Sequence, residues 1–468
     1  MKSAAPAMKK LLSLVAATAL LILVSVPVLY KHQKPFLSSA DKQFLRDAPG
    51  EFGDGQPPNF KFKLPNKNKA LSAAVPAMAQ EAVSVDFAAD AGAPTYRASG
   101  FLHGFSVDGS LPESGMVSPL KARLHRSGLR GSWAVARRVE SQGMVQQVVL
   151  ADVWGYGGKH PGDDGEWREW EERVYKTVLS AKQAGLSIQW DIWNEPDHPQ
   201  FWQRSPEQFY ETWRRAWLQI RQADSQAVIV GPSWSDVHPG MERFAEFLSY
   251  AKRNGVPPDY VSWHFPPDAV KEAGDCRALL KSEGISAGLQ INEYVLKDEQ
   301  YPAKTAWHIA RIERSGVDAS CHAVWADEDT GTLDGLLTAA GATNGTWWVY
   351  RRYADITGHL LATTPSGNIE LAAGTDSGRK TALVLLGSSN NFTGTVKLSL
   401  SHLDRASYLI NDGKLPAIIE AIADVKLERP TVIFKGDLQF NGQSLEIPVP
   451  WEDSRSAYVL RLGIGWRE

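Results

Sequence analysis

The chain has 468 residues, of which 43% are hydrophobic, and its formal net charge is −3. This length can bury one large core or two smaller ones, so we expect a main domain with an accessory domain. The scattered basic residues and near-neutral charge argue against nucleic acid as a partner. Two cysteines, Cys276 and Cys321, are too few for a disulfide framework and lack the spacing of a zinc site. A single disulfide and two buried thiols both remain open.

The first predicted element is an apolar segment near the N-terminus. Residues 11–30, LLSLVAATALLILVSVPVLY, are uncharged and follow two lysines, and twenty such residues can cross a bilayer. We favour a membrane anchor over a cleaved signal peptide, because KHQK follows the run and the nearest small-residue cleavage site, SSA at 38–40, lies far downstream. Either way the bulk of the chain is expected outside the cytoplasm, in the periplasm or cell envelope, or secreted if the segment is cleaved.

The next segment, residues 31–80, is rich in Lys, Pro, Ala, Gly and Asn and shows little hydrophobic periodicity. This composition predicts a flexible linker. The alternative is a small structured extension, in which FKFKL at 60–64 forms an edge strand.

Residues 81–360 alternate between apolar, β-rich segments and helical stretches. Eight such segments over about 230 residues predict an α/β fold, a (β/α)₈ TIM barrel with short loops. In chain order they are GFLHGFS (100–106), LRGSWA (129–134), VQQVVLADVW (145–154), LSIQWDIWNE (186–195), AVIVGPSW (227–234), YVSWHFP (260–266), ISAGLQINEY (285–294) and ASCHAVWAD (319–327). Residues 205–224 are typical of the intervening helices, with Ser205 as a capping residue and Pro206 in the first turn.

After a helix that ends near His359 the pattern changes to short alternating strands separated by turns. Residues 361–468 therefore predict an all-β accessory domain, a β-sandwich. Residues 82–98 are a candidate for one additional strand of that domain, placed before the chain enters the barrel.

Barrel enzymes place their reacting groups at the C-terminal ends of the strands. The predicted strand ends carry His103, Trp133, Asp152 with Trp154, Asn194 with Glu195, Trp234, His264, Glu293 and Trp325. The period of two along a strand puts Asp191 and Glu195 on one face of the fourth strand, and it ends an inward-pointing row of the seventh strand at Glu293. We therefore expect Glu195 and Glu293 to face the same opening from different strands.

Two carboxylates across a tryptophan-rich opening are the groups that glycoside hydrolysis requires. The sequences WNEP (193–196) and NEY (292–294) resemble the acid/base and nucleophile motifs of clan A glycoside hydrolases. Within the clan the chain is most similar to glycoside hydrolase family 39, which pairs such a barrel with a β-sandwich. GPSW (231–234), His264 and Trp325 fit the comparison, which covers residues 82–468.

The resemblance implies a retaining mechanism with Glu195 as acid/base and Glu293 as nucleophile. It also implies a hydrogen bond from Asn194 to the 2-hydroxyl of the sugar. The chain departs from common clan patterns at Pro266, where an aromatic hydroxyl is frequent, and at Asn292, where family 39 often has threonine. The implied substrate is an extracellular or envelope polysaccharide, or alternatively a short glycan as for a β-xylosidase.

The other candidate residues depend on position. His264 is expected to line the site, and His103 and Asp152 are weaker candidates for substrate binding. Asp191 is expected in a polar network inside the barrel, because a buried carboxylate needs partners. A flat apolar ring can cover the face of a sugar, which makes four tryptophans candidates for substrate contact: Trp154, Trp202, Trp234 and Trp325.

The sequence contains no pattern that calls for a metal or an organic cofactor. The eleven histidines are dispersed, HExxH is missing, and no glycine-rich loop follows the first strand. The main alternative function is a non-catalytic carbohydrate-binding protein on a glycosidase scaffold. The oligomeric state stays open.

Overall fold

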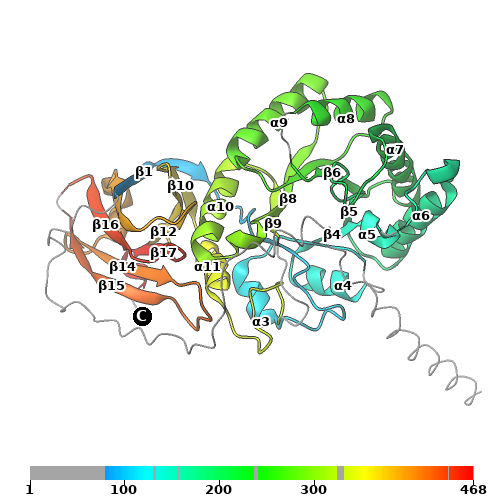
Figure 1. Cartoon of the computed structure of the whole chain (residues 1–468). Helices are drawn as coiled ribbons and strands as arrows, with labels where there is room; N and C mark the ends of the chain where they lie inside the picture. The colour runs from blue at the N-terminus through cyan, green and yellow to red at the C-terminus, as the bar shows by residue number, and fades with distance from the viewer. Residues whose placement is uncertain are drawn as a thin grey trace, which may run out of the picture. The chain divides into compact units, whose positions relative to one another are not determined.

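The computed structural model describes residues 80–129, 133–156, 158–236, 241–323, 331–440 and 442–466. Within these ranges the chain forms a closed eight-stranded barrel and a separate nine-stranded sheet (Figure 1). The predicted anchor at 11–30, the linker up to residue 79 and Trp325 lie outside the described residues. None of the described helices is both long enough and apolar enough to span a bilayer.

The barrel confirms the predicted fold class. All of its neighbouring strands are parallel, in the order of the sequence, and the last strand pairs with the first. The strands are β2 (Gly100–Leu102), β3 (Leu124–Ser127), β4 (Val145–Val149), β5 (Ile188–Asp191), β6 (Val228–Trp234), β7 (Tyr260–His264), β8 (Gly288–Tyr294) and β9 (Ala319–His322).

Helices surround the barrel, as Figure 1 shows for α6 to α10. The described helices are α3 (Ser114–Val117), α4 (Ala134–Ser141), α5 (Leu150–Trp154), α6 (Arg168–Gln183), α7 (Pro206–Ala223), α8 (Glu242–Arg253), α9 (Ala269–Glu283), α10 (Pro302–Ser315) and α11 (Gly345–Ala354). Helix α7 begins as its sequence predicts: the Ser205 side chain accepts a hydrogen bond from the Gln208 backbone N–H at 3.3 Å, and Pro206 opens the first turn.

Two predicted strands were wrong in their bounds. The second barrel strand is β3 at Leu124–Ser127, and the predicted segment 129–134 instead leads into α4, with Trp133 as its N-cap residue. The third strand ends at Val149, and the chain continues directly into α5, so Asp152 and Trp154 lie on a helix. The sequence of β3 did not reveal a strand because it is polar, although all four residues are buried and the Arg126 side chain reaches Asp191 and Glu293.

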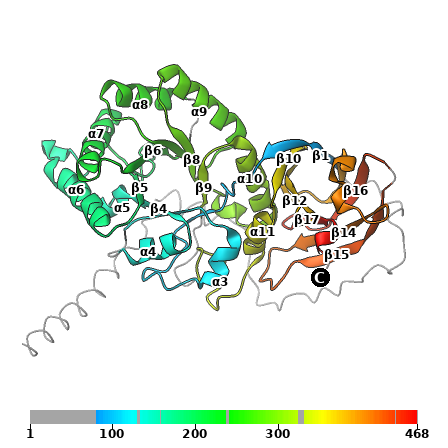
Figure 2. The same cartoon turned by 180° about the vertical axis from the view of Figure 1, so that it is seen from behind.

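The second body is a mixed sheet that curls around its own apolar core, as expected of the accessory β domain (Figure 2). Its strand order is β15-β14-β17-β12-β11-β10-β1-β13-β16. The strands are β1 (Gln80–Gly92), β10 (His359–Thr364), β11 (Ile369–Asp376), β12 (Thr381–Ser388), β13 (Gly394–Ser401), β14 (Lys414–Ile422), β15 (Thr431–Gln439), β16 (Leu445–Trp451) and β17 (Ala457–Leu462).

Strand β1 belongs to this sheet although it precedes the barrel in the sequence. It runs antiparallel to β10 and parallel to β13, and its apolar side chains Val83, Val85 and Phe87 are buried in the core of the sheet. The barrel therefore lies in the sequence between the first strand of the sheet and the other eight.

Candidate active site

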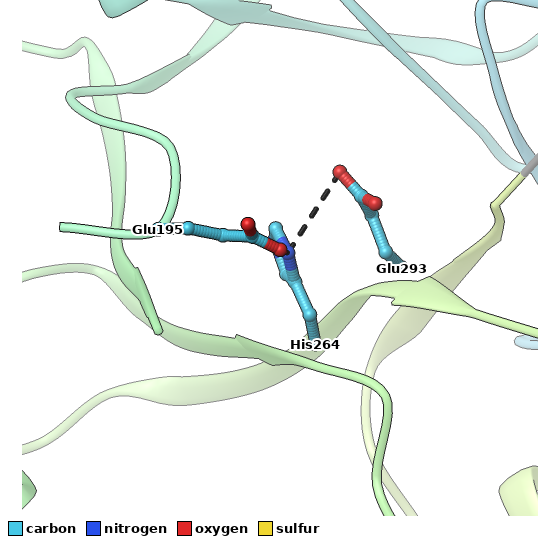
Figure 3. A group of neighbouring side chains, drawn as sticks. All are labelled: Glu195, His264 and Glu293. Carbon is cyan, nitrogen blue, oxygen red and sulfur yellow. Dashed lines mark hydrogen bonds and ion pairs between the residues drawn. The ribbon is translucent and has the colours of Figure 1, made fainter. Parts of the chain in front are cut away.

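The two candidate carboxylates meet at the C-terminal end of the barrel. Glu195 follows β5 in the left-handed region, with φ of 43°, and Glu293 lies on β8. Both side chains are largely buried, with 8% and 6% of each residue exposed. Figure 3 shows them pointing toward one another from opposite sides, and a carboxylate oxygen of each lies within 4.8 Å of the other.

His264 comes from the end of β7 and lies between the two glutamates (Figure 3). Its Nδ1 is 2.9 Å from Oε1 of Glu195 and 3.7 Å from Oε1 of Glu293. Burial lowers the pKa of His264 to about 4, although Glu293 acts in the opposite direction. The imidazole is therefore neutral near pH 7. In the tautomer that carries its proton on Nδ1, the Nδ1–H group donates a hydrogen bond to Glu195.

Arg126, on β3, is the residue of the site that the sequence reasoning missed. Its guanidinium, only 1% exposed, donates from Nη1 to Glu293 at 2.6 Å and from Nη2 to Asn194 Oδ1 at 2.8 Å. A third bond runs from Nε to Asp191 at 2.9 Å. One planar cation thus fixes the positions of both Glu293 and Asn194.

Asp191 lies in a buried polar network, as expected. Besides Arg126 it receives hydrogen bonds from the Ser233 hydroxyl at 2.9 Å and from Asn292 Nδ2 at 3.1 Å. The amide of Asn292 also donates to Gln147 Oε1 at 3.0 Å. The asparagine that departs from the family pattern therefore serves the interior of the barrel, where its amide bridges polar groups of neighbouring strands.

Burial raises the pKa of both glutamates, but their charged neighbours differ. For Glu293 the effect of burial is opposed by His264 and by Arg126, which donates a hydrogen bond directly to its carboxylate, whereas the charge of Glu195 raises the pKa further. The charge of Arg126 also lowers the pKa of Glu195, but through space and without a hydrogen bond between the two side chains. The direct hydrogen bond from Arg126 favours the ionised form of Glu293, and Glu195 has no such bond from Arg126.

A cavity of about 340 Å³ opens above these groups. It lies toward the low end of the range for small-ligand sites, ~300–1,000 Å³. Its lining comprises Leu102, His103, Arg126, Val149, Asp152, Asn194, Glu195, His198, Gln200, Phe201, Phe265 and Glu293. The structure thus brings His103 and Asp152 to the site, together with six residues besides Arg126 that were not predicted: Leu102, Val149, His198, Gln200, Phe201 and Phe265.

The described tryptophans among the candidates do not line this cavity. Trp202 and Trp234 are 5% and 4% exposed and pack in aromatic clusters, Trp202 against Trp193 and Trp234 against Phe209. Trp154, on α5, packs edge-on against Trp170. The structure therefore gives all three tryptophans aromatic partners within the protein, and their contact with substrate stays a prediction.

Three of the site residues are also of the types that bind metals. Ligand atoms of Glu195, His264 and Glu293 lie within 4.8 Å of one another. An arginine that donates to Glu293 at 2.6 Å places a fixed positive charge beside this group, and a second cation there would be repelled. The donor set therefore fits acid–base chemistry better than metal binding.

Comparison with known proteins places this site in a family context. Residues 164–289 match the model of Glycosyl hydrolases family 39, a range that includes Glu195 and ends four residues before Glu293. The similarity to family 39 inferred from the motifs is thereby confirmed. A 3-O-alpha-D-galactosyl-alpha-L-arabinofuranosidase of Bifidobacterium longum subsp. longum is 23% identical over 75% of this chain, and a 3-O-beta-L-arabinopyranosyl-alpha-L-arabinofuranosidase of Bifidobacterium pseudocatenulatum is 25% identical over 67%. The chain spans only 39% of the length of each of these two relatives.

Solved structures share the fold. A protein from Neocallimastix frontalis is 24% identical with a TM-score of 0.70, and the similarity covers 82% of this chain and all of that one. A GH39 enzyme from Xanthomonas axonopodis pv. citri is 13% identical with a TM-score of 0.60, over 83% of this chain and 99% of that one. At these identities the likeness extends to the architecture of barrel and sheet.

Proposed function

We propose, with the similarity to family 39 as the premise, that this protein is a retaining glycoside hydrolase that cleaves by double displacement. The observation that carries the proposal is the pair of buried glutamates with carboxylate oxygens within 4.8 Å of each other. Retaining enzymes hold their carboxyl groups about 5–5.5 Å apart, whereas inverting enzymes need about 6.5–9.5 Å to admit a water molecule. The short distance between the carboxylate oxygens is closer to the retaining separation than to the inverting one.

Each group then has a defined task. The Glu293 carboxylate attacks the anomeric carbon while the protonated Glu195 gives its proton to the departing oxygen, so that a glycosyl ester forms and the glycosidic bond breaks. Glu195 next takes a proton from water, whose oxygen attacks the same carbon and releases Glu293. Arg126 keeps Glu293 ionised and fixes its position. Arg126 also donates from Nη2 to Asn194 Oδ1, so the amide nitrogen of Asn194 points away from Arg126.

The substrate we propose is an extracellular or envelope polysaccharide or an oligosaccharide derived from one. A cavity of about 340 Å³ suits the end of a glycan chain better than the middle of a long polymer. The names of the relatives, two arabinofuranosidases and a Beta-xylosidase of Caldicellulosiruptor saccharolyticus, favour pentose glycosides. The apolar run at 11–30 supports a location outside the cytoplasm with an N-terminal membrane anchor.

The test is a panel of aryl glycosides with variants of the two glutamates. Glu293→Ala should remove nearly all turnover. Glu195→Ala should spare substrates such as dinitrophenyl glycosides, whose leaving groups need no protonation. A matching 2-fluoro glycoside should label Glu293, and proton NMR should show retained configuration in the first-formed product.

Two outcomes would contradict the proposal. Labelling of another carboxylate would refute the assignment of the nucleophile, and inverted configuration would refute the retaining mechanism. Sugar binding without turnover of any glycoside would instead favour the non-catalytic carbohydrate-binding protein.

A further inference from the structure

The acid/base candidate Glu195 projects from an irregular loop, whereas Glu293 and His264 project from barrel strands (Figure 3). The ladder that pairs β5 with β6 ends at Asp191 and Val230. Glu195 lies beyond this ladder, with φ of 43°. A residue other than glycine keeps such a conformation only where the surrounding structure holds it. Contacts of the loop itself must therefore fix the position of Glu195.

Two sets of hydrogen bonds tie this loop to the end of β6. The backbone N–H of Glu195 donates to the Ser233 carbonyl at 2.9 Å. Two residues on, the Asp197 carboxylate accepts the Ser235 backbone N–H through Oδ1 and the Ser235 hydroxyl through Oδ2, each at 2.9 Å. The Asp197 side chain is only 6% exposed, and Nη1 of Arg243 lies 3.6 Å from its Oδ2. The carboxylate thus continues the link between the two segments beyond the point where backbone pairing stops.

We infer, relying on the proposed function, that Asp197 is a positioning residue for proton transfer by Glu195. Ser233, to which the Glu195 backbone binds, is fully buried, and its hydroxyl donates to Asp191, so the end of β6 is a firm support. Asp197 attaches the loop to this support on the C-terminal side of Glu195. It thereby holds the acid/base carboxyl within reach of the departing oxygen, as proton transfer requires. The described lining of the cavity does not include Asp197, so Asp197 acts through Glu195.

The size of the effect follows from the sensitivity of catalysis to position, since a misplacement of about 1 Å can lower a rate about 100-fold. Asp197→Ala removes both bonds to Ser235. For a phenyl glycoside, whose leaving group needs a proton, kcat/KM should therefore fall about 100-fold. For a dinitrophenyl glycoside, whose leaving group departs without one, the loss should stay within about 3-fold. A merely structural role of Asp197 would lower both values by the same factor.

Two further variants of the full chain separate geometry from charge and from stability. In Asp197→Asn the side-chain oxygen can accept from the Ser235 backbone, and the amide can donate to the Ser235 hydroxyl. This variant should keep kcat/KM for the phenyl glycoside within about 5-fold of the parent, because both bonds persist without the charge. The matched control is Asp259→Ala. Asp259 likewise accepts a backbone N–H, from Ile229 at 2.7 Å, but just before β7 begins, at the other end of the barrel. Its loss should leave the ratio of the two kcat/KM values unchanged.

Hydrogen exchange keeps this inference separate from the proposed function. Asp197→Ala should speed amide exchange at least ~10-fold over residues 195–202, where the His198 N–H donates to the Glu195 carbonyl at 3.0 Å, and Asp259→Ala should not. Unchanged exchange in this segment would overturn the inference whether or not any glycoside is hydrolysed. Equal losses on the two aryl glycosides, or an Asp197→Asn variant as impaired as Asp197→Ala, would also overturn it. A parent that hydrolyses no glycoside would instead contradict the proposed function.

Discussion

Replacing Arg126 by methionine tests the central electrostatic claim about the site. Arg126→Met keeps most of the length of the side chain but removes the charge that faces Asp191 and Glu293, which are 0% and 6% exposed. Breaking a buried ion pair by removing one partner typically costs about 3–5 kcal/mol, because the other charge stays buried and uncompensated. The attraction to Glu293 alone, for charge centres about 4 Å apart at an effective dielectric constant of ~20, is about 4 kcal/mol.

Stability and activity should respond differently to a second substitution. Arg126→Met should lower the free energy of unfolding by about 3–5 kcal/mol, and adding Asp191→Asn should recover a large part of that loss, because the neutral amide no longer needs a cation. Activity should stay low in the double variant, since Glu293 still lacks its hydrogen bond. The acidic limb of the kcat/KM profile of Arg126→Met should lie at higher pH, because Arg126 normally opposes protonation of Glu293.

The assays are urea unfolding, followed by tryptophan fluorescence and circular dichroism, and steady-state kinetics on an aryl glycoside. Asp164→Asn serves as the control for the loss of a surface charge. If Arg126→Met unfolds within about 1 kcal/mol of the parent, or if its acidic limb does not move, the assignment of Arg126 as the balancing cation is wrong.

Three further predictions concern single features. Asn194→Ala should lower kcat more than it weakens substrate binding, because the proposed bond to the 2-hydroxyl strengthens in the transition state; an equal loss of rate in parent and variant on moving to a 2-deoxy substrate would contradict this contact. His264 binds its proton less readily when folded, with a pKa of about 4 against an ordinary 6.5, so its contribution to stability is complete above pH 6.5 and falls as the pH drops toward 4. The destabilisation caused by His264→Gln should therefore be smaller at pH 5 than at pH 7.5, by roughly 2 kcal/mol, and an equal value at both pH values would contradict the buried neutral form. Finally, N-terminal sequencing should find the run at 11–30 intact in a protein that detergent extracts and salt does not, whereas a start near Asp41 would mean a cleaved signal peptide.

Sequence patterns predicted the barrel because most of its strands are apolar runs that end in turn residues. They predicted Glu195 and Glu293 for a second reason: each lies at or just beyond the end of a strand, in a motif of recognisable chemistry. Strand β3 met neither criterion, since LHRS is short and polar and ends in no such motif, although all four of its residues are buried. A signal for Arg126 existed nonetheless, because a barrel needs a strand between β2 and α4, and residues 124–127 lie in that interval.

The packing of the tryptophans could not be predicted for a different reason. The position of a residue at a strand end is visible in the sequence, but the direction of its side chain depends on local backbone geometry. Trp234 ends β6 and packs against Phe209 and Phe247, away from the cavity. Phe201 and Phe265, which do line the cavity, follow their strands in irregular segments that no periodic pattern describes.

The placement of β1 also has consequences for how the chain is made and how it can be shortened. Gln80 pairs with Thr395, so the first strand of the sheet is synthesised 315 residues before its parallel partner. At a synthesis rate of about 5–20 residues per second, roughly 15–60 s pass between the synthesis of β1 and that of β13, and the whole barrel is synthesised in this interval. Deleting everything beyond α11 would leave β1 without the rest of its sheet. Its apolar side chains Val83, Val85 and Phe87 would then lose the core that buries them and would become exposed. A truncation that aims at the barrel alone has to begin after Gly92 as well as end before His359.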